Sequence, residues 1–336
     1  MQMKIKNIGV VLCYLMSIHF VSCNVSPKQK KEMAKKVNNP MLCDPETGVC
    51  EIPFHDVNTS EILTNETSEK AIRIIYFTDP ICSACWGVEP QLRKLKLEYG
   101  HVFDIEYRMG GLLPNWNIMG GSLSKPSDVA AHWDEVSIHY DMPIDGDLWL
   151  EDPLRSSYPP SIAFKAAQFQ DEEKAIVFLR KMRELLFLYK KNIAKWEYIS
   201  QSAAESGLDI EQLKTDYEEK AKESFQDDLL LARKMGVRGF PTFTLTNNKG
   251  ETEIIYGFRP YSIFENAFIK LVPKVNKKKY RKDWESLFSI YPTMATSEFA
   301  ELTDIRKDMA KHELESLFKS KKLNKLEIKN GTLWER

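Results

Sequence analysis

The chain has 336 residues, of which 43% are hydrophobic and 28% are charged, so it can bury a sizeable core and remain soluble. Its 47 Lys and Arg residues nearly balance its 48 Asp and Glu residues. This balance excludes an overall electrostatic attraction to nucleic acid or to an acidic substrate, so any such partner would need a local patch.

Residues 1–22 have the pattern of a secretory signal peptide. Two lysines precede an apolar stretch, Ile8 to Val21, that is too short to span a membrane comfortably. The sequence Phe-Val-Ser-Cys that ends at Cys23 resembles a bacterial lipoprotein cleavage box, although Phe20 replaces the usual Leu. We expect export to the bacterial periplasm or cell envelope, with a lipid anchor to the membrane at Cys23. The alternative is cleavage by an ordinary signal peptidase without lipidation.

Residues 23–70 are polar and have no sustained helical or strand period, which predicts a tether. Within it, Cys43 and Cys50 enclose an Asp-Pro pair and a Gly that favour a tight reversal, so a disulfide between them is sterically reasonable. With Cys82 and Cys85 they make two pairs, as an oxidising compartment favours. The first pair is interpreted as a structural clasp, or alternatively as a relay that exchanges electrons with the second.

The rest of the chain predicts an α/β domain interrupted by helices. Residues 71–126 form a βαβ unit, and residues 227–272 form a ββα unit. Between them, residues 127–226 carry apolar residues at three-and-four spacing, which predicts a helical insertion. The order of elements is that of a thioredoxin fold whose middle is opened. The expected strands are 72–78, 103–109, 242–246 and 253–256, and the expected helices outside the insertion are 82–99 and 261–272.

Residues 273–336 predict a small basic α+β module. Two helical stretches are followed by short alternating runs around Asn330-Gly331, which favour a β-hairpin. Helices followed by a hairpin resemble a winged-helix module, and the basic clusters at 274–282 and 319–325 would permit nucleic-acid binding. A solvated face explains these charges equally well. Because an exported protein meets little DNA, we expect no nucleic-acid partner.

Cys82 and Cys85 are the candidate catalytic pair, because they follow a strand at the position where helix 82–99 should begin. The first turn of a helix favours a thiolate, which is the nucleophile in disulfide exchange. We therefore expect Cys82 to attack a sulfur and Cys85, one turn further on, to resolve the mixed disulfide. The alternatives are two inert core cysteines, or a zinc site that also uses Cys43 and Cys50. The gap between the latter two is wider than zinc sites usually have, so we expect neither a metal nor a cofactor.

The segment Gly236 to Thr242, with the sequence GVRGFPT, is the second marker. Read together with the cysteine pair, it resembles the thioredoxin superfamily, whose members place a cis-proline before a strand and beside the cysteines. The resemblance implies that Pro241 is this proline and that Phe240 and Thr242 belong to a substrate groove, where backbone groups pair with an extended peptide. A trans proline that merely starts a strand is the alternative.

Residues 72–272 resemble the DsbA-like branch of this superfamily, on stretches such as YFTDPICSACW and ARKMGVRGFPTFTL. They are similar to FrnE-like oxidoreductases and to bacterial adaptors that deliver a regulator to the ClpXP protease. The resemblance implies a thiol–disulfide oxidoreductase that acts on protein substrates, or an adaptor or redox-sensing binding protein. The adaptor function conflicts with the signal peptide, because ClpXP is cytosolic. Ser83-Ala84 matches neither the Pro-His of DsbA nor the Gly-Pro of thioredoxin, so the direction of electron flow stays open.

Two further features have no assigned chemistry. The stretch Arg155 to Pro160 could form a wall of the groove, as the resemblance suggests, but a rigid loop that enters the next helix is the interpretation we favour. The histidines form no ligand-spaced or triad-like set, and we expect none to be catalytic. They are His19, His55, His101, His132, His139 and His312.

Overall fold

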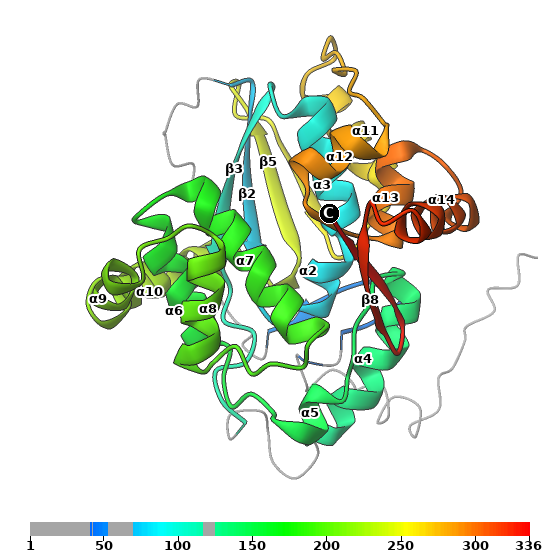
Figure 1. Ribbon diagram of the computed structural model, residues 1–336. Coiled ribbons are helices and arrows are strands. Elements are labelled where there is room, and N and C mark those ends of the chain that lie inside the picture. Colours follow the sequence, from blue (N-terminus) through cyan, green and yellow to red (C-terminus); the bar gives the residue numbers. More distant parts are fainter. Residues whose placement is uncertain (1–40, 42, 53–69, 117–124) are drawn as a thin grey trace, which may run out of the picture.

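A computed structural model describes residues 41, 43–52, 70–116 and 125–336 (Figure 1). The predicted signal peptide and the predicted lipidation site at Cys23 lie outside the described residues. In the part of the chain that is described, no helix is both long enough and apolar enough to cross a bilayer.

The centre of the molecule is a mixed sheet with the strand order β3-β2-β5-β6. Strand β2 is parallel to β3 and antiparallel to β5, and β6 is antiparallel to β5. This topology confirms the predicted thioredoxin fold with a helical insertion. The strands are β2 (Ile72–Thr78), β3 (Phe103–Met109), β5 (Thr242–Asn247) and β6 (Thr252–Tyr256).

Apart from Arg73, strand β2 is apolar on both faces, because helices cover the sheet on both sides. Ile72, Ile74 and Tyr76 face a core shared with α3 (Glu89–Tyr99) and α11 (Tyr261–Leu271). Phe77 faces the other core, which the insertion helices complete. The end of β2 therefore delivers the chain to the cysteines between two packed layers.

The predicted helix 82–99 is wrong in one respect, because it consists of two helices. Helix α2 covers Ser83–Gly87, and α3 starts at Glu89 after Val88, which is the N-cap of α3. Pro90 lies in the first turn of α3 and has no N–H to donate to the preceding turn, so the hydrogen-bond ladder is interrupted there.

The insertion forms a helical layer against the second face of the sheet (Figure 1). Its last helix, α10, continues past the predicted boundary at residue 226, because the apolar spacing continues and ends only near Met235. The helices are α4 (Pro126–Tyr140), α5 (Leu148–Glu151), α6 (Tyr158–Gln168), α7 (Glu172–Phe187), α8 (Trp196–Glu205), α9 (Ile210–Glu218) and α10 (Ala221–Lys234).

The C-terminal module has the order helix, strand, two helices, hairpin, and its sheet order is β7-β9-β8. The hairpin at Asn330-Gly331 is present, and its tip contacts the insertion: Lys329 pairs with Asp134 and Asp147. The elements are α12 (Trp284–Ile290), β7 (Thr293–Ala295), α13 (Thr296–Thr303), α14 (Lys307–Lys319), β8 (Asn324–Ile328) and β9 (Gly331–Glu335).

A buried ion cluster joins this module to the rest of the molecule. Glu298 of α13 is fully buried and accepts two hydrogen bonds from Arg180 of α7, at 2.8 and 3.0 Å. Arg93 of α3 lies 3.2 Å from the same carboxylate. Because one carboxylate ties two arginines from different layers, the module is held in one position on the body of the protein.

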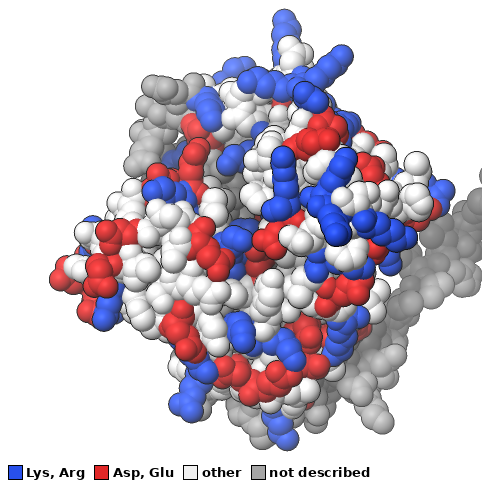
Figure 2. Space-filling view, in the orientation of Figure 1, with Lys and Arg blue, Asp and Glu red and all other residues white. Residues whose placement is uncertain are grey.

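Several basic residues of the module are paired with acidic residues of the same protein. Lys277 contacts Glu98 and Glu265, and Lys325 contacts Glu315 and Glu327. Figure 2 shows Lys and Arg side chains interspersed with Asp and Glu over this face of the molecule. The charges predicted as a basic patch therefore act in part as intramolecular ion pairs.

Residues 43–52, which we call the covering segment, depart from the predicted tether because they pack in the core. Cys43, Val49 and Cys50 are all at most 2% exposed. Within the segment, β1 (Cys50–Glu51) pairs with β4 (Gly239–Phe240) in antiparallel fashion. The tether was predicted from composition. Composition does not show that a few apolar residues within a polar region can pair with a strand far along the chain.

Candidate active site

Cys82 is the N-cap residue of α2, as the sequence predicted for the first cysteine of the pair. Its Sγ accepts a hydrogen bond from the backbone N–H of Cys85 at 3.2 Å. The backbone N–H of Cys82 in turn donates to the carbonyl of Asp79 at 3.2 Å, which closes the turn between β2 and α2. Both cysteines are free thiols and both are fully buried.

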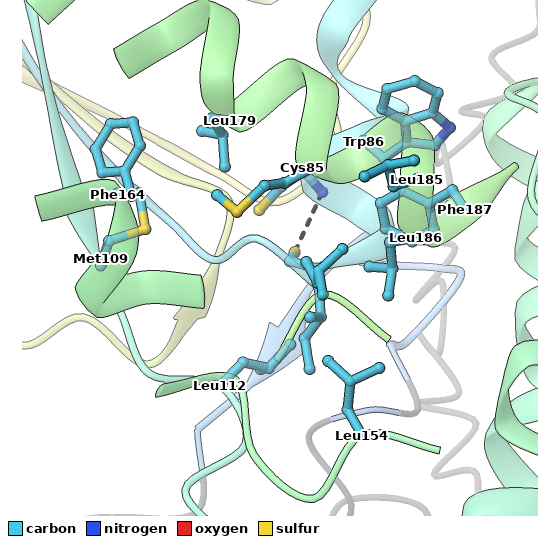
Figure 3. Close-up of a cluster of buried hydrophobic side chains, with 14 of the residues drawn as sticks. Cys85, Trp86, Met109, Leu112, Leu154, Phe164, Leu179, Leu185, Leu186 and Phe187 are labelled. Atoms are coloured by element: carbon cyan, nitrogen blue, oxygen red, sulfur yellow. Dashed lines mark hydrogen bonds between the residues drawn. The ribbon is translucent and has the colours of Figure 1, made fainter. Parts of the chain in front are cut away.

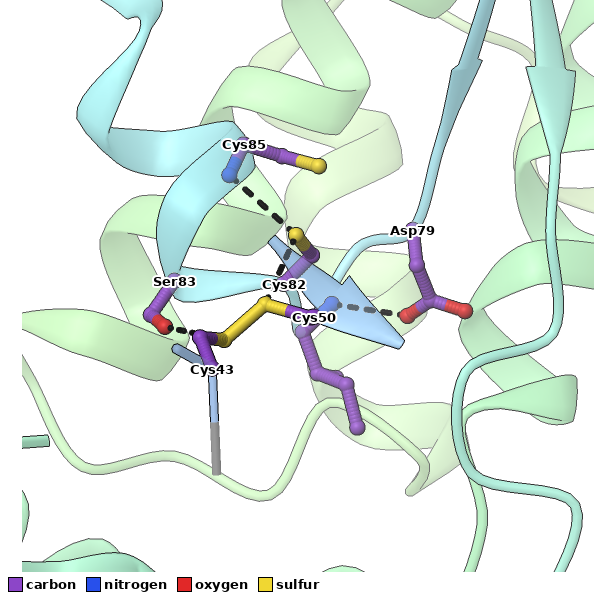
Figure 4. Close-up of a disulfide and its surroundings, with 7 residues drawn as sticks. Cys43, Cys50, Asp79, Cys82, Ser83 and Cys85 are labelled. Atoms are coloured by element: carbon purple, nitrogen blue, oxygen red, sulfur yellow. Dashed lines mark hydrogen bonds between the residues drawn. A yellow bond between two sulfur atoms is a disulfide. The ribbon is translucent and has the colours of Figure 1, made fainter. Parts of the chain in front are cut away.

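The covering segment lies directly over these thiols (Figure 4). Cys43 and Cys50 form a disulfide, and the Sγ of Cys50 lies 3.5 Å from the Sγ of Cys82. The Sγ of Cys43 lies 3.2 Å from the hydroxyl of Ser83. The two cysteine pairs, 32 residues apart in the sequence at their nearest members, therefore meet at one point.

The backbone beside Pro241, where the sequence predicts a substrate groove, is paired with the covering segment. The peptide bond between Phe240 and Pro241 is cis, and the backbone of Phe240 pairs with Cys50. The Phe240 side chain does not line a surface: it is fully buried and lies so close to Gly110 that no side chain would fit there. Thr242 is also buried, and its hydroxyl donates to the carbonyl of Gly239 at 2.7 Å.

Burial changes which thiol is the more acidic. Burial raises the pKa of the Cys82 thiol well above its ordinary value, and the hydrogen bond from the Cys85 amide works in the opposite direction without overcoming it. Burial would also raise the pKa of Cys85, but the Cys82 thiol, Arg183 and Thr78 together lower it. With the covering segment in place, Cys82 is therefore held as a thiol, contrary to the expectation of a thiolate at this position.

Arg183 is a residue of the site that the sequence did not indicate. It extends from α7 in the insertion, is fully buried, and donates to Glu89 at 2.6 Å and to the Thr78 hydroxyl at 2.7 Å. Its positive charge contributes to the lowered pKa of Cys85. The one available signal was an arginine on the apolar face of a predicted helix, which must find a buried partner.

Asp79 is the second residue that the sequence reasoning missed. Its carboxylate is fully buried and accepts hydrogen bonds from the backbone of Ile81 at 3.0 Å, from Leu112 at 2.7 Å and from the Ser157 hydroxyl at 2.9 Å. Burial raises its pKa to about 6. Ser157 belongs to the stretch Arg155 to Pro160, which enters α6 as we favoured and also fastens the loop before the cysteines.

A hydrophobic shell closes the site on the insertion side (Figure 3). Met109, Phe164 and Leu179 lie around Cys85, and none is more than 2% exposed. This shell comes from β3, α6 and α7, so the sheet and the insertion both contribute to it. Among the described residues, no group of three His, Cys, Asp or Glu side chains has the geometry of a metal site.

The family model described as Thioredoxin matches residues 76–266, a range that contains both cysteines and Pro241. The chain belongs to the thioredoxin superfamily.

Curated relatives match most of the chain, and one solved structure shares its fold. The "ClpXP adapter protein SpxH" of Halalkalibacterium halodurans is 33% identical over 302 residues, which is 88% of this chain and 97% of the relative. The protein of the same name from Bacillus subtilis is 30% identical over 272 residues, 80% of this chain and 90% of the relative. A solved structure from Nitrosomonas europaea, named a "putative protein disulfide isomerase", has 18% identity and a TM-score of 0.52, and covers 61% of this chain and 97% of its own. The similarity to the Nitrosomonas europaea structure concerns the fold alone.

Proposed function

We propose that this DsbA-like protein is an exported thiol–disulfide oxidoreductase that exchanges disulfides with protein substrates. Cys82 attacks the substrate disulfide and Cys85 resolves the mixed disulfide. The observation that carries the proposal is the contact at 3.5 Å between Cys82 and a disulfide sulfur held on a strand paired with the backbone of Phe240. An extended substrate peptide would use the same backbone pairing.

The covering segment must move before an external disulfide can reach Cys82, because both thiols are fully buried. The segment is fastened by its buried side chains and by backbone hydrogen bonds, from Ile52 to the Arg238 carbonyl at 2.7 Å and from Phe258 to the Gly48 carbonyl at 2.8 Å. A competing substrate strand could replace the pairing at β4, so displacement exchanges one set of hydrogen bonds for another. Once the segment has moved, water reaches Cys82 and the burial that raises the pKa of this thiol is relieved.

Reduction of insulin disulfides with glutathione, and reoxidation of reduced ribonuclease, test this function. We expect Cys82→Ser to lower both rates to the background and Cys85→Ser to accumulate mixed disulfides with the substrate protein. Ser200→Ala, on α8 with a partly exposed side chain, serves as the matched surface variant and should retain both activities. Turnover by Cys82→Ser at the wild-type rate would exclude the proposed enzyme.

Export is the part of the proposal that rests on residues 1–23. It is supported by their sequence and by the Cys43–Cys50 disulfide, since disulfides persist in oxidising compartments. Cell fractionation and labelling with a fatty-acid analogue test it, with Cys23→Ala as the variant. We expect the label and membrane association to depend on Cys23. Recovery of the wild type in the cytosol, unlabelled, would refute export.

The second candidate function is that of an adapter without turnover. It is favoured by the 33% identity to a "ClpXP adapter protein SpxH" over 88% of the chain. This function predicts direct binding to purified ClpX, measured by calorimetry, that is unchanged in Cys82→Ser. Binding of that kind, together with cytosolic location and no disulfide turnover, would select the adapter over the oxidoreductase.

A further inference from the structure

The covering segment occupies the backbone edge of β4 that we propose for an extended substrate peptide. Its strand β1 pairs antiparallel with β4, in the register of Cys50 with Phe240 and Glu51 with Gly239. The approach is close, because a Cβ added at Gly239 would lie 2.5 Å from the Cys50 carbonyl oxygen. At the turn of the segment, Gly48 has a positive φ of 65° and packs directly on Phe258. The segment is therefore in close contact with the body of the protein both at its turn and along β1.

The two sulfurs of the covering disulfide have different neighbours (Figure 4). The Sγ of Cys50 is the one next to the Sγ of Cys82, at 3.5 Å, which is within the roughly 3 to 3.5 Å of a near-attack arrangement. The Sγ of Cys43 faces the hydroxyl of Ser83 at 3.2 Å. One sulfur is thus placed to be attacked and the other is placed beside a hydrogen-bond donor.

We propose that the Cys43–Cys50 disulfide is the internal redox partner of Cys82 and Cys85, with Cys50 as the sulfur that Cys82 attacks and Cys43 as the leaving group. The proposal rests on the proposed oxidoreductase function and names the first exchange that its cysteine pair undergoes. It selects the relay over the purely structural clasp.

The exchange balances within one chain. Because Cys82 is held as a thiol under the covering segment, its proton passes to the Cys85 thiolate as its Sγ attacks the Sγ of Cys50. The Cys50–Cys82 bond forms, the Cys43–Cys50 bond breaks, and Cys43 leaves as a thiolate that takes up this proton. The Cys85 thiolate then attacks the Sγ of Cys82, which forms the Cys82–Cys85 disulfide and releases Cys50. Two electrons pass from Cys82 and Cys85 to Cys43 and Cys50, which take up the proton of Cys82 and one proton from water. No external oxidant or reductant is consumed, and the steps are reversible.

Ser83 is a positioning residue in this scheme. Its hydroxyl is buried and lies next to Cys43, where it can donate a hydrogen bond to the departing thiolate. A better stabilised leaving thiolate accelerates exchange. Ser83, one of the two residues between the active-site cysteines, therefore acts on the covering disulfide.

Two double variants of the full-length chain test which sulfur is the partner. Cys43→Ser with Cys85→Ser keeps Cys50 and Cys82, and Cys50→Ser with Cys85→Ser keeps Cys43 and Cys82. We expect oxidised glutathione to close an intramolecular disulfide about tenfold faster in the first variant, because its sulfurs are already at near-attack distance. Equal rates, or faster closure in the second variant, would overturn the proposal. Circular dichroism checks that both variants are folded to the same extent.

A single variant that retains the covering disulfide provides a second measurement. In Cys85→Ser, exchange stops at the mixed disulfide, and acid quenching from pH 8 preserves the linkages. Cleavage after Glu46, which lies between Cys43 and Cys50, separates the two cysteines for mass spectrometry. We expect a Cys50–Cys82 linkage with a free Cys43. Its absence overturns the proposal, as does a linkage of Cys82 to Cys43.

The role of Ser83 has its own readout. Ser83→Ala should slow the attack of Cys82 on Cys50 severalfold and shift the pH profile of this rate to higher pH. Ser83→Thr, which keeps a hydroxyl, should restore the wild-type profile. Identical pH profiles for all three proteins would show that Ser83 has no part in the exchange.

None of the experiments on internal exchange contains a substrate protein. Internal exchange without turnover of insulin or ribonuclease would therefore refute the proposed function and leave the internal redox partner supported. Turnover of these substrates without internal exchange would refute the internal redox partner and leave the proposed function supported.

Discussion

Replacing Asp79 by Asn should remove a pH dependence of folding stability that lies between about pH 4 and pH 6. The carboxyl group is fully buried beside the redox site, and burial raises its pKa from 3.8 to about 6 against the opposing hydrogen bonds from Leu112, Ile81 and Ser157. The folded-state pKa thus exceeds the unfolded-state pKa. Its contribution to stability is complete below the unfolded pKa and is lost as the pH rises through the folded pKa.

The magnitude follows from the size of the shift. A rise of about two pKa units corresponds to about 3 kcal/mol of unfolding free energy. Other carboxyl groups titrate in the same range, so the wild type alone does not isolate Asp79. The difference between the unfolding free energies of wild type and Asp79→Asn does isolate it, because the remaining groups are common to both proteins.

Urea unfolding at pH values from 4 to 7 measures this difference. We expect the stability of the wild type relative to Asp79→Asn to fall by about 3 kcal/mol as the pH rises across that range. Ser157→Ala, which removes a hydrogen bond to the carboxylate, should move the transition to a higher pH. A difference that stays constant from pH 4 to pH 7, or that grows with pH, would refute the reasoning.

Three further substitutions test the surroundings of the site. Arg183→Met should raise the pKa of Cys85, followed by thiolate absorbance, and lower the unfolding free energy by about 3 kcal/mol because it breaks a buried ion pair. Glu298→Ala should cost about 3 to 5 kcal/mol in urea unfolding, since two buried arginines lose their counter-charge. Gly239→Ala should speed the alkylation of Cys82 in the native protein, because the added Cβ would collide with the covering segment.

Each of these substitutions has a control. Lys181→Met, on the same helix as Arg183 but with a partly exposed side chain, should change the unfolding free energy by less than about 1 kcal/mol. Glu315→Ala removes a more exposed partner of Lys325 and should cost far less than Glu298→Ala. For Gly239→Ala, the alkylation rate is compared with the rate of global unfolding. An unchanged rate, or one that only follows global unfolding, would contradict the collision with the segment.

Local pattern was sufficient for the elements of the central sheet. Strands 72–78 and 103–109 have the predicted bounds, because a short apolar run between turn signals carries its own strand signal. Helix 82–99 was one helix in the prediction and two in the structure, since a single Pro90 decides whether the hydrogen bonds continue. The C-terminal hairpin was likewise visible as an Asn-Gly turn between alternating runs.

The sequence by itself determined the α/β thioredoxin order, the position of Cys82 at a helix start and the spacing that lets Cys85 lie one turn away. These depend on neighbours within a few residues. Only the tertiary structure decided that the covering segment pairs with the backbone beside Pro241, that Arg183 from the insertion lies near the thiols and that burial holds Cys82 protonated. Such features depend on contacts between residues that are far apart in the chain, and on the water that those contacts exclude.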